Sequence, residues 1–215
     1  MTTMTIDAHA TALTRTRYQR LSPFYDLMEG MAEFRYDPWR KKLWSLVSGS
    51  KVLEVGVGTG KNMPHYPKGI QITAIDLTPG MLDVARRHAE KLRPNVDLRL
   101  GDAQSLEFPD SSFDAAVATF VFCSVPDPIL GLRELARVVK PDGKILLLEH
   151  IRSENEVIGK VMDALNPIVV KMMGANINRR TVENVEKAGL PIESVEDLGM
   201  GGIFKLITAR ALFRI

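Results

Sequence analysis

Apolar positions between residues 51 and 149 fall in short runs that are separated by segments of helical periodicity. The runs at 51–56, 70–75, 96–100, 113–118 and 143–149 are apolar enough to predict buried parallel strands. The intervening segments at 60–66, 79–92 and 127–139 predict helices, and runs at 192–198 and 204–211 predict a final strand pair. Seven strands alternating in this way with helices predict an α/β fold with a doubly wound, mostly parallel sheet.

The residues before the first strand predict helices. A helical pattern covers residues 8–31 and is interrupted by Pro23, after which Phe24 starts another helix. Pro38 stands where the first turn of a helix tolerates proline, ahead of a helix at 39–47. We therefore divide the chain into an N-terminal helical cap or lid, residues 1–47, and a main domain, residues 48–215.

The segment at about 154–180 is an unusual insertion in the main domain. Its apolar residues share one helical stripe, opposite a polar face, and Pro167 is expected to kink it. Such a stripe either packs on the sheet as core or shelters apolar chains, and the sequence leaves both open. The following helix is expected to be capped at Thr181 and to end at Gly189.

Composition narrows the protein class. A chain of 215 residues with 25% charged residues suits one soluble domain, and a net charge of +2 does not call for nucleic acid. The single cysteine, Cys123, excludes an internal disulfide and a cysteine-cluster metal site, and no metal site is expected. The first residues have neither the basic nor the apolar part of a secretory signal. We expect a cytoplasmic protein that is soluble or peripheral to a membrane.

Polar residues or glycine follow each of the first four strands, at Gly56, Asp76, Asp102 and Thr119. The carboxyl ends of parallel strands meet at one edge of a sheet, so these residues predict a site for one nucleotide-like ligand. The two aspartates suit ribose hydroxyls and an adenine amino group, respectively. Carboxylates without a P-loop lysine favour a positively charged nucleoside over a pyrophosphate.

The first loop carries glycines at alternate positions, Gly56, Gly58 and Gly60, after the acidic residue Glu54. The dinucleotide fingerprint has two residues before its last glycine, so this spacing argues against an NAD-dependent oxidoreductase. Glu54 lies below the first glycine, where an acid can position backbone or a bound cation.

These motifs together resemble the class I S-adenosylmethionine-dependent methyltransferases, over residues 18–211. The resemblance implies a Rossmann-like fold, S-adenosyl-L-methionine as cofactor and S-adenosyl-L-homocysteine as product. It further implies that the glycines contact the methionyl part, Asp76 the ribose and Asp102 the adenine amine. The full set of cofactor-binding residues that it implies is Tyr18, Tyr25, Glu54, Gly56, Gly58, Gly60, Asp76, Leu77, Met81, Asp102, Ala103 and Thr119.

Two further resemblances concern the acceptor. Residues 21–26, LSPFYD, resemble the entry segment of quinone-biosynthesis and phospholipid methyltransferases, in which an N-terminal helix closes over the cofactor. Residues 147–152, LLEHIR, and 174–181, GANINRRT, are similar to bacterial phosphatidylethanolamine N-methyltransferases. This similarity implies methylation of phosphatidylethanolamine and its methylated derivatives towards phosphatidylcholine. Arg179 and Arg180 would then hold the phosphate, although an arginine pair at a helix start can equally be solvated.

Methyl transfer to an amine requires positioning and a group that takes up a proton. The candidate bases are His150, Tyr25 and Tyr18, with His150 preferred because it ends the fifth strand; it can equally satisfy a loop carbonyl. Basic residues near the N-terminus either meet an anionic membrane surface or form a solvated face: Arg15, Arg17, Arg20 and the run 40–42.

Other activities stay open. Within the same class, the acceptor can be a quinone ring carbon, a small molecule or a thiol. Outside it, the chain can be a non-catalytic S-adenosylmethionine-binding protein associated with membranes. The expected partners are a phospholipid substrate and an anionic membrane surface, without nucleic acid, for a monomer or weak oligomer.

Overall fold

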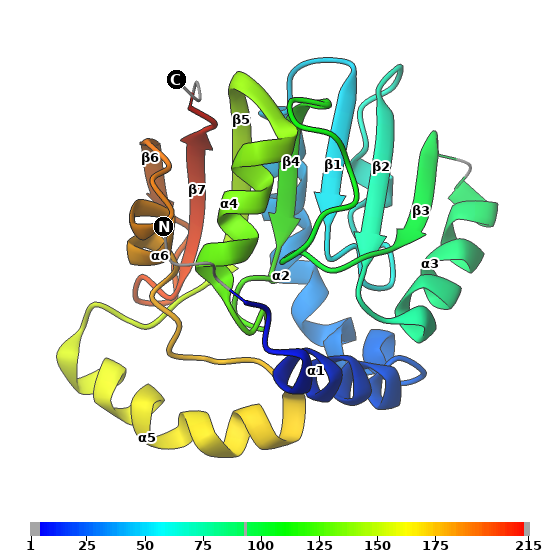
Figure 1. Cartoon of the computed structure of the whole chain (residues 1–215). Coiled ribbons are helices and arrows are strands. Elements are labelled where there is room, and N and C mark those ends of the chain that lie inside the picture. Colours follow the sequence, from blue (N-terminus) through cyan, green and yellow to red (C-terminus); the bar gives the residue numbers. More distant parts are fainter. Residues whose placement is uncertain (1–4, 93, 213–215) are drawn as a thin grey trace.

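In the computed structural model, which describes residues 5–92 and 94–212, seven strands form one sheet in the order β3-β2-β1-β4-β5-β7-β6 (Figure 1). The strands are β1 (Lys51–Val55), β2 (Gln71–Asp76), β3 (Val96–Leu100), β4 (Phe113–Thr119), β5 (Val139–His150), β6 (Ile192–Asp197) and β7 (Phe204–Arg210). The first five pair in parallel, and β7 runs antiparallel to β5 and β6. The predicted mostly parallel, seven-stranded α/β sheet is therefore confirmed.

Helices cover both faces of the sheet and lie along one of its edges. They are α1 (Ala8–Leu21), α2 (Tyr25–Ser45), α3 (Pro79–Leu92), α4 (Pro128–Val138), α5 (Glu156–Met173) and α6 (Thr181–Lys187), with a short 3-10 helix η1 (Met63–His65). Successive strand residues point to opposite faces, so Leu53 joins the core beneath α4 and α6 whereas Val52 joins the core beneath α2 and α3. Each face of the sheet thus has its own buried apolar cluster.

The strand order creates a crevice at the carboxyl ends of β1 and β4. The chain runs from β1 outward to β2 and β3, then returns to the other side of β1 as β4. Ligands of doubly wound sheets bind at such a switch point, outside the carboxyl ends of the strands. Helix α1 lies across this edge, and α5 lies beyond it (Figure 1).

Several element boundaries differ from the prediction. Pro38 lies inside the continuous helix α2 and does not start a helix. Proline there leaves the carbonyl of Phe34 without its helical partner, which water can satisfy because Phe34 is 88% exposed. Of the helix expected at 60–66, only η1 forms. Thr181 is the first residue of α6 and not its cap; Arg180 occupies that position.

Helix α5 runs without interruption through Pro167 and is almost unpacked. Asn155 caps its start, accepting hydrogen bonds from the backbone of Val157 and Ile158, and Gly174 ends it in a left-handed conformation. Only Gly159 and Met162 are buried in this helix. The alternative that its apolar stripe packs on the sheet is therefore wrong. Within the described part of the chain, none of the helices combines the length and apolarity needed to cross a bilayer.

Candidate active site

A cavity opens at the carboxyl ends of β1 to β4, beneath α1. The residues that line it are Thr14, Tyr18, Tyr25, Val55, Gly56, Gly58, Ile75, Asp76, Leu77, Thr78, Met81, Gly101, Asp102, Ala103, Thr119, Phe120, Val121, Ser124, Val125 and Pro126.

The glycine loop after β1 forms one wall and needs its glycines for backbone reasons. Gly56 and Gly58 have φ angles of 69° and 55°, which L side chains rarely adopt. A Cβ atom on Gly56 would also lie 2.4 Å from a methyl group of Val121, in the loop after β4. The loop is thus held close to the opposite wall.

Asp76 connects this loop to the end of β2. Its Oδ2 atom accepts a hydrogen bond from the backbone of Gly58 at 2.9 Å, and Oδ1 accepts one from the backbone of Thr78 at 2.8 Å. Burial raises the pKa of Asp76, and these two N–H donors oppose that rise. The carboxylate can accept additional hydrogen bonds on the cavity side.

Asp102 occupies the corresponding position after β3. Its Oδ1 atom accepts a hydrogen bond from the backbone of Gln104 at 2.9 Å, and the Gln104 amide also contacts both carboxylate oxygens at 3.2 Å. The same amide donates to Thr11 of α1 at 3.0 Å. Asp102 and the helix that covers the cavity are therefore linked through one side chain.

The opposite end of the cavity, after β4, is lined by hydroxyl groups and aromatic rings. Thr119 accepts a hydrogen bond from Asn62 at 3.0 Å. Tyr18 and Ser124 share a hydrogen bond of 2.5 Å between their oxygens, and the Tyr18 and Tyr25 ring centroids lie 6.4 Å apart. We call this part, formed by Tyr18, Tyr25, Thr119, Phe120 and Ser124, the reactive end.

Comparison with known proteins places this architecture in a family. A family described as "Methyltransferase domain" matches residues 53–147. A demethylmenaquinone methyltransferase of Lactobacillus johnsonii is 30% identical over 174 residues, which are 75% of this chain and 71% of that protein. The chain belongs to the class I S-adenosylmethionine-dependent methyltransferases.

Other relatives differ in the acceptor that their names give. A phosphatidylethanolamine N-methyltransferase of Cereibacter sphaeroides is 40% identical over 119 residues, covering 54% of this chain and 59% of that protein. A demethylmenaquinone methyltransferase of Renibacterium salmoninarum is 34% identical over 137 residues, covering 61% and 56%. The chain thus spans somewhat more than half the length of these two relatives.

Solved structures agree on the fold. A Thermotoga maritima S-adenosylmethionine-dependent methyltransferase, described as a possible histamine N-methyltransferase, superposes with a TM-score of 0.71 at 21% identity, covering 91% of this chain and 99% of that one. The [4+2]-cyclase SpnF superposes with a TM-score of 0.67 at 22% identity, covering 84% and 81%. At these identities the likeness shows the fold alone.

S-adenosylmethionine is the cofactor that family and fold imply, and the cavity residues suit its chemistry. Bound there, the cofactor supplies an electrophilic methyl group on a sulfonium. Asp76 offers acceptors for ribose hydroxyls, Asp102 for an adenine amine, and Met81 an apolar wall. Ten of the twelve cofactor residues predicted from sequence line the cavity; Glu54 and Gly60 do not.

Glu54 acts from beneath the cavity floor. It is buried and accepts hydrogen bonds from Asn62, at 2.6 Å, and from Tyr66. Burial raises the pKa of Glu54. Since Asn62 also donates to Thr119, Glu54 positions the floor of the reactive end, and its contact with the cofactor stays a prediction. Gly60 serves the turn, where a Cβ atom would lie 2.7 Å from Met63.

The structure does not bring His150 to the cavity. Its ring packs edge-on against Phe204 at 5.4 Å, and burial lowers the pKa of His150. Of the three candidate bases, Tyr18 and Tyr25 line the cavity. The assignment of a base stays a prediction, but the geometry favours the tyrosines.

The two arginines predicted to hold phosphate diverge. Arg179 is turned inward and donates to the backbone carbonyl of Val125 at 2.9 Å. Arg180 is 56% exposed and pairs with Glu183 at 2.8 Å. Neither lines the cavity, so their phosphate role stays a prediction.

Sequence reasoning missed the residues that fasten α1 over the cavity. Besides Thr11, Gln19 accepts a hydrogen bond from the backbone of Gly80 at 2.9 Å. Asp26, at the start of α2, accepts a hydrogen bond from Thr59 of the glycine loop at 2.7 Å. These are isolated polar side chains on helices, and nothing in their spacing distinguishes them from solvated ones.

Proposed function

We propose that this chain transfers methyl groups from S-adenosylmethionine to the amine of phosphatidylethanolamine and its mono- and dimethyl derivatives at a membrane surface. The observation that carries this proposal is the exposed apolar face of α5, beside the helix that covers the cavity (Figure 1). The relative from Cereibacter sphaeroides, whose name gives the same activity, supports it.

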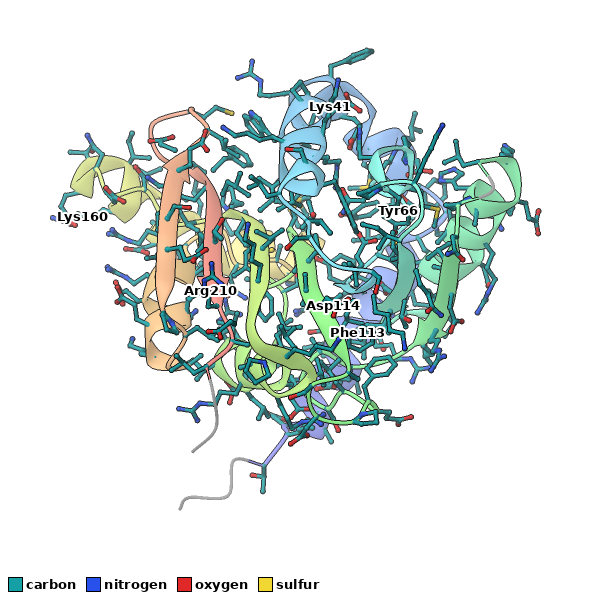
Figure 2. The ribbon with its side chains drawn as sticks, turned by 90° about the horizontal axis from the view of Figure 1, so that it is seen from above. Lys41, Tyr66, Phe113, Asp114, Lys160 and Arg210 are labelled. Carbon is teal, nitrogen blue, oxygen red and sulfur yellow. The ribbon has the colours of Figure 1, made fainter. Side chains whose placement is uncertain are left out.

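The apolar face of α5 is exposed along most of the helix. Five of its side chains are between 47% and 74% exposed: Val157, Val161, Leu165, Ile168 and Met172. A helix with one apolar and one charged face is suited to lie in the interface of a bilayer. Lys160 projects outward from the same helix (Figure 2).

The start of α2 adds apolar surface near the cavity. Phe24 and Leu27 are 61% and 83% exposed, and they flank Tyr25, which lines the reactive end. Basic residues accompany these surfaces, since Arg15 and Arg20 on α1 are exposed. Of the basic run 40–42, however, Arg40 cannot contact a membrane surface, because it is buried and bound to Glu33. Cationic side chains near such apolar groups favour an anionic lipid surface.

The reactive end suits an uncharged nucleophile. The lone pair of the acceptor nitrogen forms a bond to the methyl carbon as the carbon–sulfur bond breaks, which leaves a neutral thioether. After the first and second transfers the new ammonium group loses a proton, whereas the third transfer leaves a quaternary ammonium that has none to lose. Tyr18 and Ser124 present hydroxyl groups there, and the rings of Tyr25 and Phe120 stabilise a cationic nitrogen by cation–π attraction. Alignment of nitrogen, carbon and sulfur supplies much of the rate.

The test is labelled S-adenosylmethionine incubated with mixed vesicles that contain phosphatidylethanolamine, followed by separation of the lipids. We expect label in phosphatidylcholine or its partly methylated precursors. Label that enters only an added demethylated quinone would overturn the proposal.

The second candidate is methylation of a quinone ring carbon. The observation that favours it is the demethylmenaquinone methyltransferases among the relatives, at 30–34% identity.

A non-catalytic role is the third candidate function. The cyclase of the same fold illustrates that the fold alone does not determine the reaction. Cofactor binding without release of S-adenosylhomocysteine from any acceptor would favour it.

A further inference from the structure

The loop of residues 120–126 forms the wall of the reactive end and starts from a strained residue. Phe120, Val121, Ser124, Val125 and Pro126 all line the cavity. Phe120 has a φ angle of +57°, in the left-handed region that bulky residues avoid. Strain of this kind persists only where the surroundings enforce it.

Glu149, which lies beneath the loop, holds Phe120 in this left-handed conformation. This residue of β5 is fully buried, and its Oε1 atom accepts hydrogen bonds from the backbone N–H groups of Val121 and Phe122, both at 3.0 Å. Directly before them, the N–H group of Phe120 donates to the carbonyl of Leu148 at 2.8 Å. Three consecutive N–H groups, beginning at the strained residue, are therefore bound to the end of β5.

The outer part of the loop is held from the side. Arg179 donates to the carbonyl of Val125, and both the backbone and the side chain of Asn176 donate to the carbonyl of Cys123, at 2.9 and 3.0 Å. The hydrogen bond between Tyr18 and Ser124 joins the loop to α1. Three separate segments therefore hold this loop in place: the end of β5, residues 176–179 and α1.

One oxygen of the Glu149 carboxylate lacks a hydrogen-bond partner in the part of the chain that the structure describes. Among the described residues, the Oε2 atom of Glu149 and the Nε atom of Arg179 are buried without a hydrogen-bond partner. Burial raises the pKa of Glu149 to about 7, opposed by the loop N–H groups and by the charge of Arg179. The other ionisable group that faces it is Cys123, whose pKa burial raises to about 12, and Asp127 lies near Arg179.

We propose that Glu149 is a positioning residue for methyl transfer. It holds residues 120–126 in the conformation that presents Phe120 and Ser124 to the acceptor, and it leaves the cofactor contacts of Asp76 and Asp102 unaffected. The proposal rests on the methyltransferase activity proposed above but not on which acceptor is used. If Glu149 only supported the fold, its replacement would change stability alone. If Glu149 positions the loop, its replacement lowers kcat while the affinity for S-adenosylmethionine stays constant.

The test compares Glu149→Gln and Glu149→Ala with the control Asp114→Asn. Asp114 also accepts hydrogen bonds from two adjacent N–H groups, those of Ser50 and Lys51, at 2.7 and 2.9 Å, but it lies at the start of β4, whereas the cavity lies at the carboxyl end of that strand. For Glu149→Ala we expect kcat to fall on the order of tenfold to a hundredfold, because misplacement by about 1 Å has effects of this size. Calorimetric affinity for S-adenosylmethionine should stay within about twofold. The control should keep its kcat.

A second measurement does not depend on turnover. In NMR spectra, Glu149→Ala should shift the amide resonances of Val121 and Phe122, because their N–H groups lose the carboxylate that accepts their hydrogen bonds. Unchanged amide resonances at these two residues, or an unchanged kcat in folded Glu149→Ala, would overturn the positioning role. Absence of turnover in the unaltered protein with every acceptor would instead contradict the proposed function, while the amide resonances still decide whether Glu149 holds the loop.

Discussion

Individual acids in this chain organise backbone, and their place in the sheet decides what that organisation achieves. Asp76 joins the glycine loop to the end of β2, and Glu149 joins the loop after β4 to the end of β5. Both lie at the carboxyl edge, so the backbone that they hold is cavity wall. Asp114 makes equivalent bonds at the opposite edge, where they only tie strands together.

Tyr18 and His150 give a prediction at this scale. Replacing Tyr18 by Phe removes the hydroxyl that is hydrogen-bonded to Ser124 at the reactive end. We expect kcat to fall by about tenfold, the effect of losing one hydrogen bond worth roughly 1.5 kcal/mol. His150→Gln should stay within about threefold of the unaltered protein, because Phe204 and not the cavity contacts its ring. Steady-state kinetics of both variants decides this, and the reverse order of effects would restore His150 as the base.

The same two residues show what the sequence could predict at this scale. Strand ends identified Asp76, Asp102 and Thr119 correctly as neighbours, because parallel strands end at one edge. The same reasoning failed for His150 because it ignored the alternation of side chains along a strand. Leu148 and His150 point to the face covered by α2, whereas Leu147 and Glu149 point to the other face, under the loop after β4. The sequence shows where a strand ends, but the face to which a side chain points depends on whether its position in the strand is odd or even.

At the level of elements, periodicity predicted every strand but not the surroundings of α5. An amphipathic stripe indicates that one face of a helix is apolar, and it cannot say whether protein or lipid covers that face. Nor could it show that α2 passes through Pro38, because that depends on solvent reaching a free carbonyl.

Helix α5 carries the prediction at this scale. The double variant Leu165→Glu and Ile168→Glu places two charges on its exposed face, where 47% and 57% of these side chains are accessible. We expect weaker co-sedimentation with anionic vesicles and lower turnover of lipid, while thermal stability and cofactor affinity are kept. Val195→Glu on β6, a position 41% exposed, is the matched control and should bind vesicles normally. Equal loss in both variants would show that α5 has no special role at the membrane.

For the whole molecule, the ionisable groups shape how stability depends on pH. Burial raises the pKa of Glu149 from 4.5 to about 7, so its contribution to stability is complete below about 4.5 and is lost as pH rises through about 7. Asp114 acts in the opposite sense: hydrogen bonds from Lys140 and from the N–H groups of Lys51 and Ser50 lower its pKa below 3.8, so its contribution is lost on acidification. Stability should therefore be greatest between these two ranges, in mildly acidic solution.

Thermal unfolding between about pH 3 and about pH 8 tests this balance. The ionisation of Glu149 alone corresponds to at most on the order of 3 kcal/mol, which for a chain of this length is roughly 6–12 °C in Tm. Glu149→Gln removes that titration, so its Tm should fall less than that of the unaltered protein between pH of about 5 and about 8. Asp114→Asn should be less stable than the unaltered protein near neutrality, and this difference should shrink on acidification. Parallel curves for Glu149→Gln and the unaltered protein would mean that this acid keeps an ordinary pKa in the fold, with its buried carboxylate stabilised more strongly by Arg179 and the loop N–H groups than the geometry indicates.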